Sequence, residues 1–258
     1  MFKRLAERRP ILFSVMATVV FVVAIVLISF VGALTRHPAA LEAVGAGGRG
    51  GITVLAAVLL SRLGAPCARL LRFPREPRAW LIGLLPLLYV VVAYPLLFTG
   101  RLSLNLSDPV LAASVGANGF SAGVVEEAIF RGIILCVLTR HWGVSRKGLV
   151  RVLPATSALF SLPHALNVFA GADPLRVLAQ LVWALLLGIV FAALVLVSNS
   201  IWPAAVVHGV ANAVVHVNRL GVAIEPSGGL AVLMALAPLP LVVYAILLLR
   251  RGVEPRSL

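Results

Sequence analysis

Charged residues are scarce in this sequence of 258 residues. Only 12% of the residues are charged and 61% are hydrophobic, whereas a soluble domain carries about 25% charged residues. The mean hydropathy is +1.06. These values exclude a disordered chain and argue against a soluble globular protein. They predict an all-α, polytopic membrane protein in which residues 1–258 form a single integral membrane domain.

Cysteines and acidic residues are also few. The two cysteines, Cys67 and Cys136, are too few for a disulfide framework, so we expect both to be small packing residues. The net charge of +13 comes from 22 basic and 9 acidic residues. The basic residues flank apolar runs and form no basic patch interleaved with aromatic residues. This pattern argues against nucleic acid as a partner and favours orientation in a lipid bilayer.

Long apolar runs supply the membrane spans. A helix needs about 20 apolar residues to cross the hydrocarbon core, and the sequence predicts about eight such helices around a buried polar cavity. The second is the weakest, because GAGGRGG at residues 45–51 interrupts it. The first apolar run is too long for a signal peptide, so we expect it to be retained. The expected spans cover residues 11–34, 41–63, 79–99, 109–139, 151–170, 175–197, 199–218 and 228–249.

The charges between the spans predict the orientation. If the N-terminus is cytoplasmic, 16 of the 22 basic residues fall in cytoplasmic segments. This bias follows the positive-inside rule and predicts a multi-pass cell-membrane protein with both termini in the cytoplasm. The arginine- and alanine-rich composition resembles that of bacterial proteins. Five basic residues fall in the outer segments: Arg36, Arg49, Arg101, Arg176 and Arg219.

Two adjacent acidic residues, Glu126 and Glu127, lie in the middle of the fourth span. Each costs at least ~2.5 kcal/mol in hydrocarbon, so an ionisable residue at this depth indicates a functional site. Glu127 and Arg131 are four residues apart and can pair on one helix face. Glu126 is rotated by about 100° from that face and can point into a cavity. A purely structural salt bridge would need only one of the two glutamates.

Two histidines lie at a comparable depth on other spans. His164 follows Phe160 on the fifth span, and His208 precedes Asn212 by one turn on the seventh. Counting from the expected span ends places these residues and the glutamates about 14–21 Å below the cytoplasmic surface, so they can converge on one pocket. Pro163 directly precedes His164, and we expect it to move Leu162 out of the αR region and to kink the helix.

This set of side chains permits peptide hydrolysis without a covalent nucleophile. A carboxylate beside a histidine can deprotonate water, and a second histidine with an asparagine can donate hydrogen bonds to an oxyanion. The sequence has no GxSxG and no HExxH motif. A metal site made of Glu126, His164 and His208 is a chemically reasonable alternative.

Three motifs in this order resemble those of a known family. Residues 126–131 match EExxxR, residues 160–164 match FxxxH, and residues 208–212 match HxxxN. The sequence is therefore similar to the CAAX protease and bacteriocin-processing (CPBP or Abi) family, which includes the type II CAAX prenyl endopeptidases. The similarity covers roughly residues 109–215, which we expect to be the catalytic core.

The resemblance implies an intramembrane glutamate endopeptidase of eight helices whose cavity opens to the cytoplasm. Glu126 and His164 would activate the water, His208 and Asn212 would form the oxyanion hole, and Glu127 and Arg131 would support the site. The expected partners are the lipid bilayer and a peptide or lipidated-peptide substrate from the cytoplasmic side. We expect no cofactor and favour a site without a metal. Two alternatives are a non-enzymatic bacteriocin-immunity or scaffold protein of the same fold, and a proton-coupled transporter that uses both glutamates.

Overall fold

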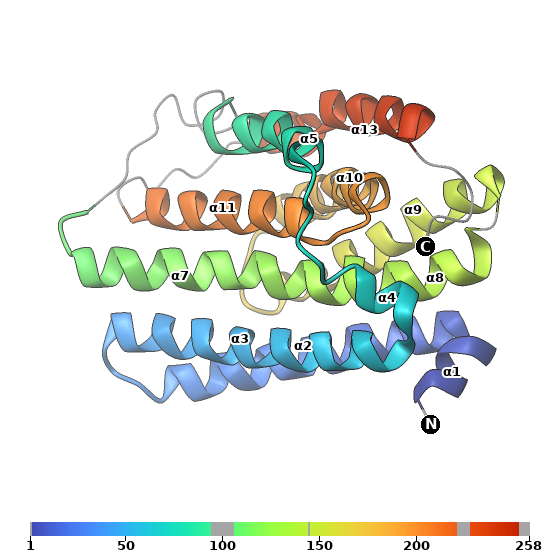
Figure 1. Ribbon diagram of the computed structural model, residues 1–258. Helices are drawn as coiled ribbons and strands as arrows, with labels where there is room; N and C mark the ends of the chain where they lie inside the picture. Colours follow the sequence, from blue (N-terminus) through green and yellow to red (C-terminus); the bar gives the residue numbers. More distant parts are fainter. Residues whose placement is uncertain (1, 94–105, 144, 221–227, 253–258) are drawn as a thin grey trace.

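The computed structural model describes residues 2–93, 106–143, 145–220 and 228–252, and Figure 1 shows these residues as a bundle of helices. No strand occurs among the described residues. The prediction of an all-α fold is therefore confirmed. The helical elements are α1 (Phe2–Arg8), α2 (Pro10–Ala33), α3 (Pro38–Leu63), α4 (Ala65–Arg69), α5 (Pro77–Leu88), η1 (Tyr89–Ala93), α7 (Pro109–Glu126), η2 (Glu127–Ile134), α8 (Leu135–Trp142), α9 (Arg146–Ser161), η3 (Leu162–Val168), α10 (Pro174–Ser198), α11 (Trp202–Arg219), α12 (Gly228–Leu236) and α13 (Leu239–Gly252).

The long helices follow the apolar runs of the sequence. Several begin with a proline, which suits the first helical position because the missing N–H would have no partner there. Residues 94–99 of the expected third span lie outside the described residues. Within the described part of the chain, five helical stretches are long and apolar enough to cross a membrane: Pro10–Ala33, Pro38–Leu63, Lys147–Val168, Pro174–Ser198 and Ala231–Arg250.

The glycine-rich segment 45–51 does not interrupt the second span. It lies inside the continuous helix α3, where its glycines allow close packing. A Cβ on Gly48 would meet the side chain of Ile28 at 2.7 Å, and one on Gly45 would meet that of Asn118 at 2.6 Å. The placement of Arg49 in an outer segment is therefore wrong, because this arginine lies in the middle of a helix.

The expectation for the two cysteines is corrected in the same way. Cys67 on α4 and Cys136 on α8 form a disulfide, with their Cα atoms 5.7 Å apart. Both are fully buried, as packing residues would be. Their pairing depends on the contact between α4 and α8, and this contact joins positions 69 residues apart in the chain.

Helix α7 occupies the middle of the bundle, with α3 on one side and α11 on the other (Figure 1). Two glycines of α7 allow a very close approach to α11. A Cβ on Gly119 would lie 2.9 Å from the carbonyl oxygen of Asn212, and one on Gly123 would lie 2.5 Å from the nitrogen of Gly209. Glycines four residues apart are a common device for packing membrane helices. This contact brings His208 of α11 to Glu126 of α7 and Glu127 of η2.

Several of the predicted cytoplasmic segments meet at one end of the bundle. Arg140 at the end of α8 donates to the carbonyl of Leu63 at 3.0 Å. The turn before α11 is bonded to the segment after α4, because the Ile201 nitrogen donates to Leu70 at 2.9 Å and the Trp202 indole donates to Leu71 at 2.8 Å. These bonds fix the point at which α11 begins. The side of the bilayer that this end faces remains a prediction.

Candidate active site

Glu127 forms the buried anchor of the site. Its side chain is fully buried, and its Oε1 atom lies 3.0 Å from Nη1 of Arg131 and 2.9 Å from Nδ1 of His208. The first of these contacts is the ion pair that the four-residue spacing predicts. Glu127 is also the first residue of the π-helical segment η2, and such segments are frequent at functional sites.

Arg131 is fully buried among aromatic rings. Its guanidinium carbon lies 4.1 Å from the ring centroid of Phe160 and 5.4 Å from that of Phe191. The faces of these rings attract the cation, so the charge is balanced by one carboxylate and two π-systems. This arrangement holds the arginine in place and leaves the carboxylate of Glu127 fixed.

His208 joins the two glutamates. Its Nδ1 atom donates to the carboxylate of Glu127, and its Nε2 atom lies 3.5 Å from Oε2 of Glu126. The ring stacks on Phe191, with centroids 4.8 Å apart and an interplanar angle of 22°. The Nδ1 bond and this stacking orient the ring. His208 therefore presents Nε2 to the carboxylate of Glu126.

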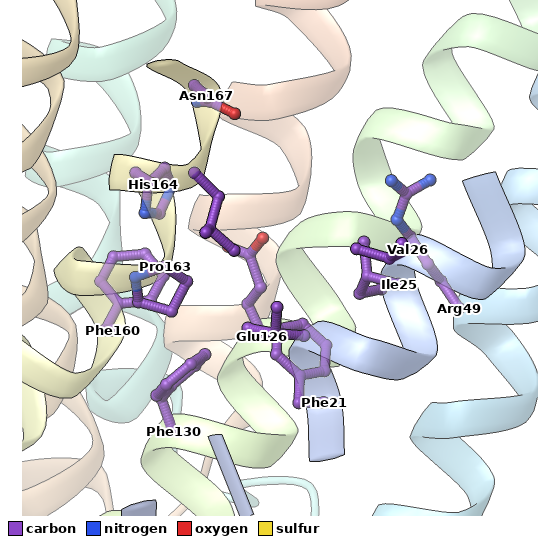
Figure 2. A pocket seen from close by; sticks show the side chains of 12 residues that line it. Phe21, Ile25, Val26, Arg49, Glu126, Phe130, Phe160, Pro163, His164 and Asn167 are labelled. Atoms are coloured by element: carbon purple, nitrogen blue, oxygen red, sulfur yellow. The ribbon is translucent and has the colours of Figure 1, made fainter. Parts of the chain in front are cut away.

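Glu126 is the exposed member of the pair of glutamates. Its side chain is 22% exposed and lines a cavity of about 230 Å³ between α2, α3, α7, η2, α9 and η3. Figure 2 shows its carboxylate between the η3 side, which carries His164, and the α2 and α3 side, which carries Arg49. The remaining lining is mainly apolar. It comprises Phe21, Val22, Ile25, Val26, Phe130, Phe160, Pro163, Leu166 and Asn167.

His164 lies on η3, which lines the same cavity (Figure 2). Its Nδ1 atom lies 3.1 Å from the carbonyl oxygen of Ser161. Because a carbonyl only accepts, Nδ1 carries the proton, and Nε2 of the neutral ring is free to accept one. The ring of Phe160 meets that of His164 edge-on at 5.5 Å.

The expected effect of Pro163 is only partly found. Leu162 stays in the αR region, with φ −52° and ψ −40°, so the expectation that it leaves this region is wrong. The chain responds instead by changing from the α-helix α9 to the 3₁₀-helix η3 at Leu162. The 3₁₀ geometry still fits αR dihedral angles, and it aims His164 into the cavity.

The structure brings together five of the six expected site residues. Glu126, Glu127, Arg131 and His208 form one contact network, and His164 shares the cavity with Glu126. Asn212 lies one turn after His208 on α11. Neither His208 nor Asn212 is among the residues that line the cavity. Within the described ranges, no three His, Cys, Asp or Glu side chains are grouped as metal ligands.

Two features of the site, Arg49 and Phe191, were not predicted from the sequence. Arg49 lines the cavity from α3, although an arginine within an apolar run is a signal of the kind that drew attention to Arg131. Phe191 carries no such signal, because α10 is apolar over most of its length. Asn167 lines the cavity and donates its amide to Gln180 at 2.9 Å, which ties η3 to α10.

Comparison with known protein families matches residues 108–214 to a family described as Type II CAAX prenyl endopeptidase Rce1-like. The matched range includes all six expected site residues. Neither the comparison with curated proteins nor the comparison with solved structures gives a match.

Proposed function

Because residues 108–214 of this chain belong to the Type II CAAX prenyl endopeptidase Rce1-like family, we propose that the protein hydrolyses peptide bonds within the membrane with a water molecule activated by Glu126 and His164. The observation that carries the proposal is the difference between the two adjacent glutamates. Glu127 is buried and held by Arg131 and His208, whereas Glu126 faces the cavity. A fixed carboxylate beside an accessible one suits a supporting residue and a base.

Glu126 is the general base in this proposal. Glu126 and His164 line the same cavity, and the proposal places the attacking water there, hydrogen-bonded to the carboxylate of Glu126 and to Nε2 of His164. As this water attacks the carbonyl carbon of the substrate, Glu126 takes up its proton. The protonated site then gives a proton to the leaving amine, and the peptide bond breaks.

His208 and Asn212 supply the oxyanion hole in this proposal. The Nδ1 bond to Glu127 leaves Nε2 of His208 directed at Glu126, 3.5 Å from Oε2. Because Nδ1 already donates to Glu127, Nε2 can donate only when the ring carries both protons, and the two glutamates beside it balance that charge. The proposal therefore gives His208 the doubly protonated form, in which Nε2–H donates to the oxygen of the attacked carbonyl as negative charge develops on it. Asn212 lies on the same helix one turn further on and is assigned the second donor.

The substrate is a peptide or lipidated peptide that enters from the cytoplasmic side. The walls of the cavity are mainly apolar, which suits hydrophobic side chains or an attached lipid chain. The reaction as proposed uses only side chains of this protein and water.

The decisive experiment compares protein termini by mass spectrometry in cells that carry wild type, Glu126→Gln or His164→Ala. The matched control is Glu76→Gln, which changes an exposed glutamate at the start of α5. All four proteins are brought to equal amounts in the membrane. The proposal expects new peptide termini with wild type and Glu76→Gln, and none with the two site variants.

A second outcome would replace the proposal. If all four proteins give the same termini, and both site variants restore the phenotype of a deletion, the protein acts without hydrolysis. The alternative of an immunity or scaffold protein would then explain the fold.

A further inference from the structure

Arg49 places a positive charge on the cavity wall that faces the proposed catalytic residues. It lies near the middle of α3 and lines the cavity together with Glu126 and His164. Figure 2 shows Arg49 on one side of Glu126 and His164 on the other. An arginine at this depth in a membrane helix costs several kcal/mol unless it is paired or faces a polar space. Its position therefore needs an explanation.

The guanidinium is held in place by a neutral side chain, and two carboxylates, those of Glu126 and Glu42, lie in its surroundings. Its Nη1 atom donates to the side-chain oxygen of Asn118, and the amide of Asn118 donates to the carboxylate of Glu42. Gly45 leaves the room for this contact, because a Cβ there would lie 3.0 Å from Nη1 of Arg49. Among the described residues, no carboxylate lies within ion-pair distance of Arg49. The guanidinium thus keeps most of its five N–H donors for another partner.

A contact between α3 and α7 explains only part of this arrangement. A neutral donor on α3 could equally well donate a hydrogen bond to the side-chain oxygen of Asn118. Such a residue would not bring a charge to the cavity wall. The remaining lining is mainly apolar, apart from Glu126, His164 and Asn167. Glu126 and Arg49 thus bring opposite charges to the same cavity, one that repels an anion and one that attracts it.

We propose that Arg49 is a specificity residue that binds a carboxylate of the substrate and directs the peptide bond toward Glu126. This inference rests on the proposed peptidase function. A planar guanidinium matches the geometry of a carboxylate and binds it with paired hydrogen bonds. The cavity of about 230 Å³ is below the 300–1,000 Å³ typical of ligand pockets, so the carboxylate and the scissile bond are close in the substrate chain. The carboxylate is either the C-terminal group or the side chain of an aspartate or glutamate.

The test uses the full-length protein in lipid vesicles and one synthetic peptide library in three forms. The first form has free C-terminal carboxylates, the second has C-terminal amides, and the third has asparagine and glutamine in place of aspartate and glutamate. Relative kcat/KM values come from the loss of each peptide in competition, read by mass spectrometry. The variants are Arg49→Gln and Arg49→Lys, with Arg62→Gln as the control for an exposed arginine on the same helix.

Wild type is expected to lose about 10- to 100-fold in kcat/KM when the recognised carboxylate is neutralised, the range of a charge-assisted hydrogen bond. On peptides that keep the recognised carboxylate, kcat/KM of Arg49→Gln is expected to fall below that of wild type by the same factor. On peptides in which this carboxylate is neutralised, kcat/KM of Arg49→Gln is expected to equal that of wild type. Arg49→Lys is expected to show a smaller loss that is confined to the charged form, since it keeps the charge without the fork. A lower kcat/KM of wild type on the amidated peptides would identify the C-terminal carboxylate. A lower kcat/KM on the peptides with asparagine and glutamine would identify a side-chain carboxylate.

Other results would overturn the inference. An equal drop in kcat on all three forms would mean that Arg49 acts on Glu126 and not on the substrate. No change in Arg49→Gln would remove its role altogether. If Arg49→Gln does not fold, as judged by size exclusion, Arg49→Lys decides by the same comparison of forms.

A binding measurement separates this inference from the proposed function. If wild type cleaves no form, the peptidase proposal fails, and retention of the three forms is then measured on Glu126→Gln protein with and without the Arg49→Gln change. Preferential retention of the charged form that depends on Arg49 supports the anion site. Equal retention of all forms overturns it.

Discussion

Two neighbouring glutamates occupy opposite environments at the residue scale. Glu127 is fully buried, whereas the side chain of Glu126 is 22% exposed. The difference follows from the helix, since consecutive residues point about 100° apart. One side of the helix meets α11 and the aromatic rings around Arg131, and the other meets the cavity. The two side chains are chemically identical. Their surroundings alone make Glu127 a structural anion and Glu126 the proposed base.

This separation predicts opposite effects of two conservative changes. Glu127→Gln leaves the guanidinium of Arg131 buried without its carboxylate, which costs about 3–5 kcal/mol in the free energy of unfolding. Glu126→Gln removes only the longer contact to His208, 3.5 Å from a side chain that is 22% exposed. Its unfolding temperature therefore stays closer to that of wild type, while the proposed activity is lost. Thermal unfolding in detergent, followed by tryptophan fluorescence, measures both. Equal destabilisation by the two variants would contradict the separation.

At the scale of elements, the approach of α7 to α11 decides the geometry of the site. Gly123 lies opposite the backbone of His208 and Gly209, and a Cβ there would come within 2.7 Å of the carbonyl carbon of His208. The atoms that a Cβ would meet belong to the backbone of α11 and cannot rotate aside as a side chain can, so the two helices must move apart. The contact of His208 with both glutamates depends on this distance.

We therefore expect Gly123→Ala to lower the free energy of unfolding by about 1–3 kcal/mol, the usual cost of overpacking. It should also lower the proposed peptidase activity at least about tenfold, because a shift of an ångström at the site can cost more. Gly116→Ala on the same helix is the control, since its Cβ would meet only Val217 at 3.5 Å. The peptidase activity of both variants is measured with equal amounts of each protein in the membrane. Wild-type activity in Gly123→Ala would show that α11 tolerates the shift.

At the scale of the whole molecule, the positive-inside bias predicts which end of the bundle faces the cytoplasm. The corner between α3 and α4, the end of α8 and the start of α11 are joined at one end. The turn between α2 and α3 connects the opposite ends of these helices. The basic segments gather at the first end, so that end is expected to face the cytoplasm.

Single added cysteines test this orientation. Both positions chosen are exposed: Lys147 near the start of α9, and His37 between α2 and α3. With a membrane-impermeant maleimide, His37→Cys should be labelled in intact cells and Lys147→Cys only after the membrane is opened. The native cysteines, joined in a disulfide, should add no background. Labelling of Lys147→Cys in intact cells would reverse the orientation, and labelling of wild type would contradict the disulfide.

Local properties of the sequence determined the helical fold and the centre of the site. The length of an apolar run sets whether a helix can cross a bilayer, so expected spans such as 11–34 and 175–197 fall within a residue or two of α2 and α10. The spacing of Glu127 and Arg131 is likewise a property of one helix, and the ion pair is present. The roles assigned to Glu126, His164, His208 and Asn212 stay predictions.

Contacts between distant segments were decided only by the tertiary structure. Arg49 was expected in an outer segment, within glycines expected to interrupt the second span. Those glycines instead serve helix packing, and the arginine faces Glu126 across the cavity (Figure 2). The disulfide joins α4 to α8, and the stacking of Phe191 on His208 joins α10 to α11. Hydrophobicity and helical periodicity act between residues a few positions apart, whereas the orientation of one helix against another depends on all the side chains between them. The sequence therefore indicated which residues carry the chemistry, and packing decided which of them meet.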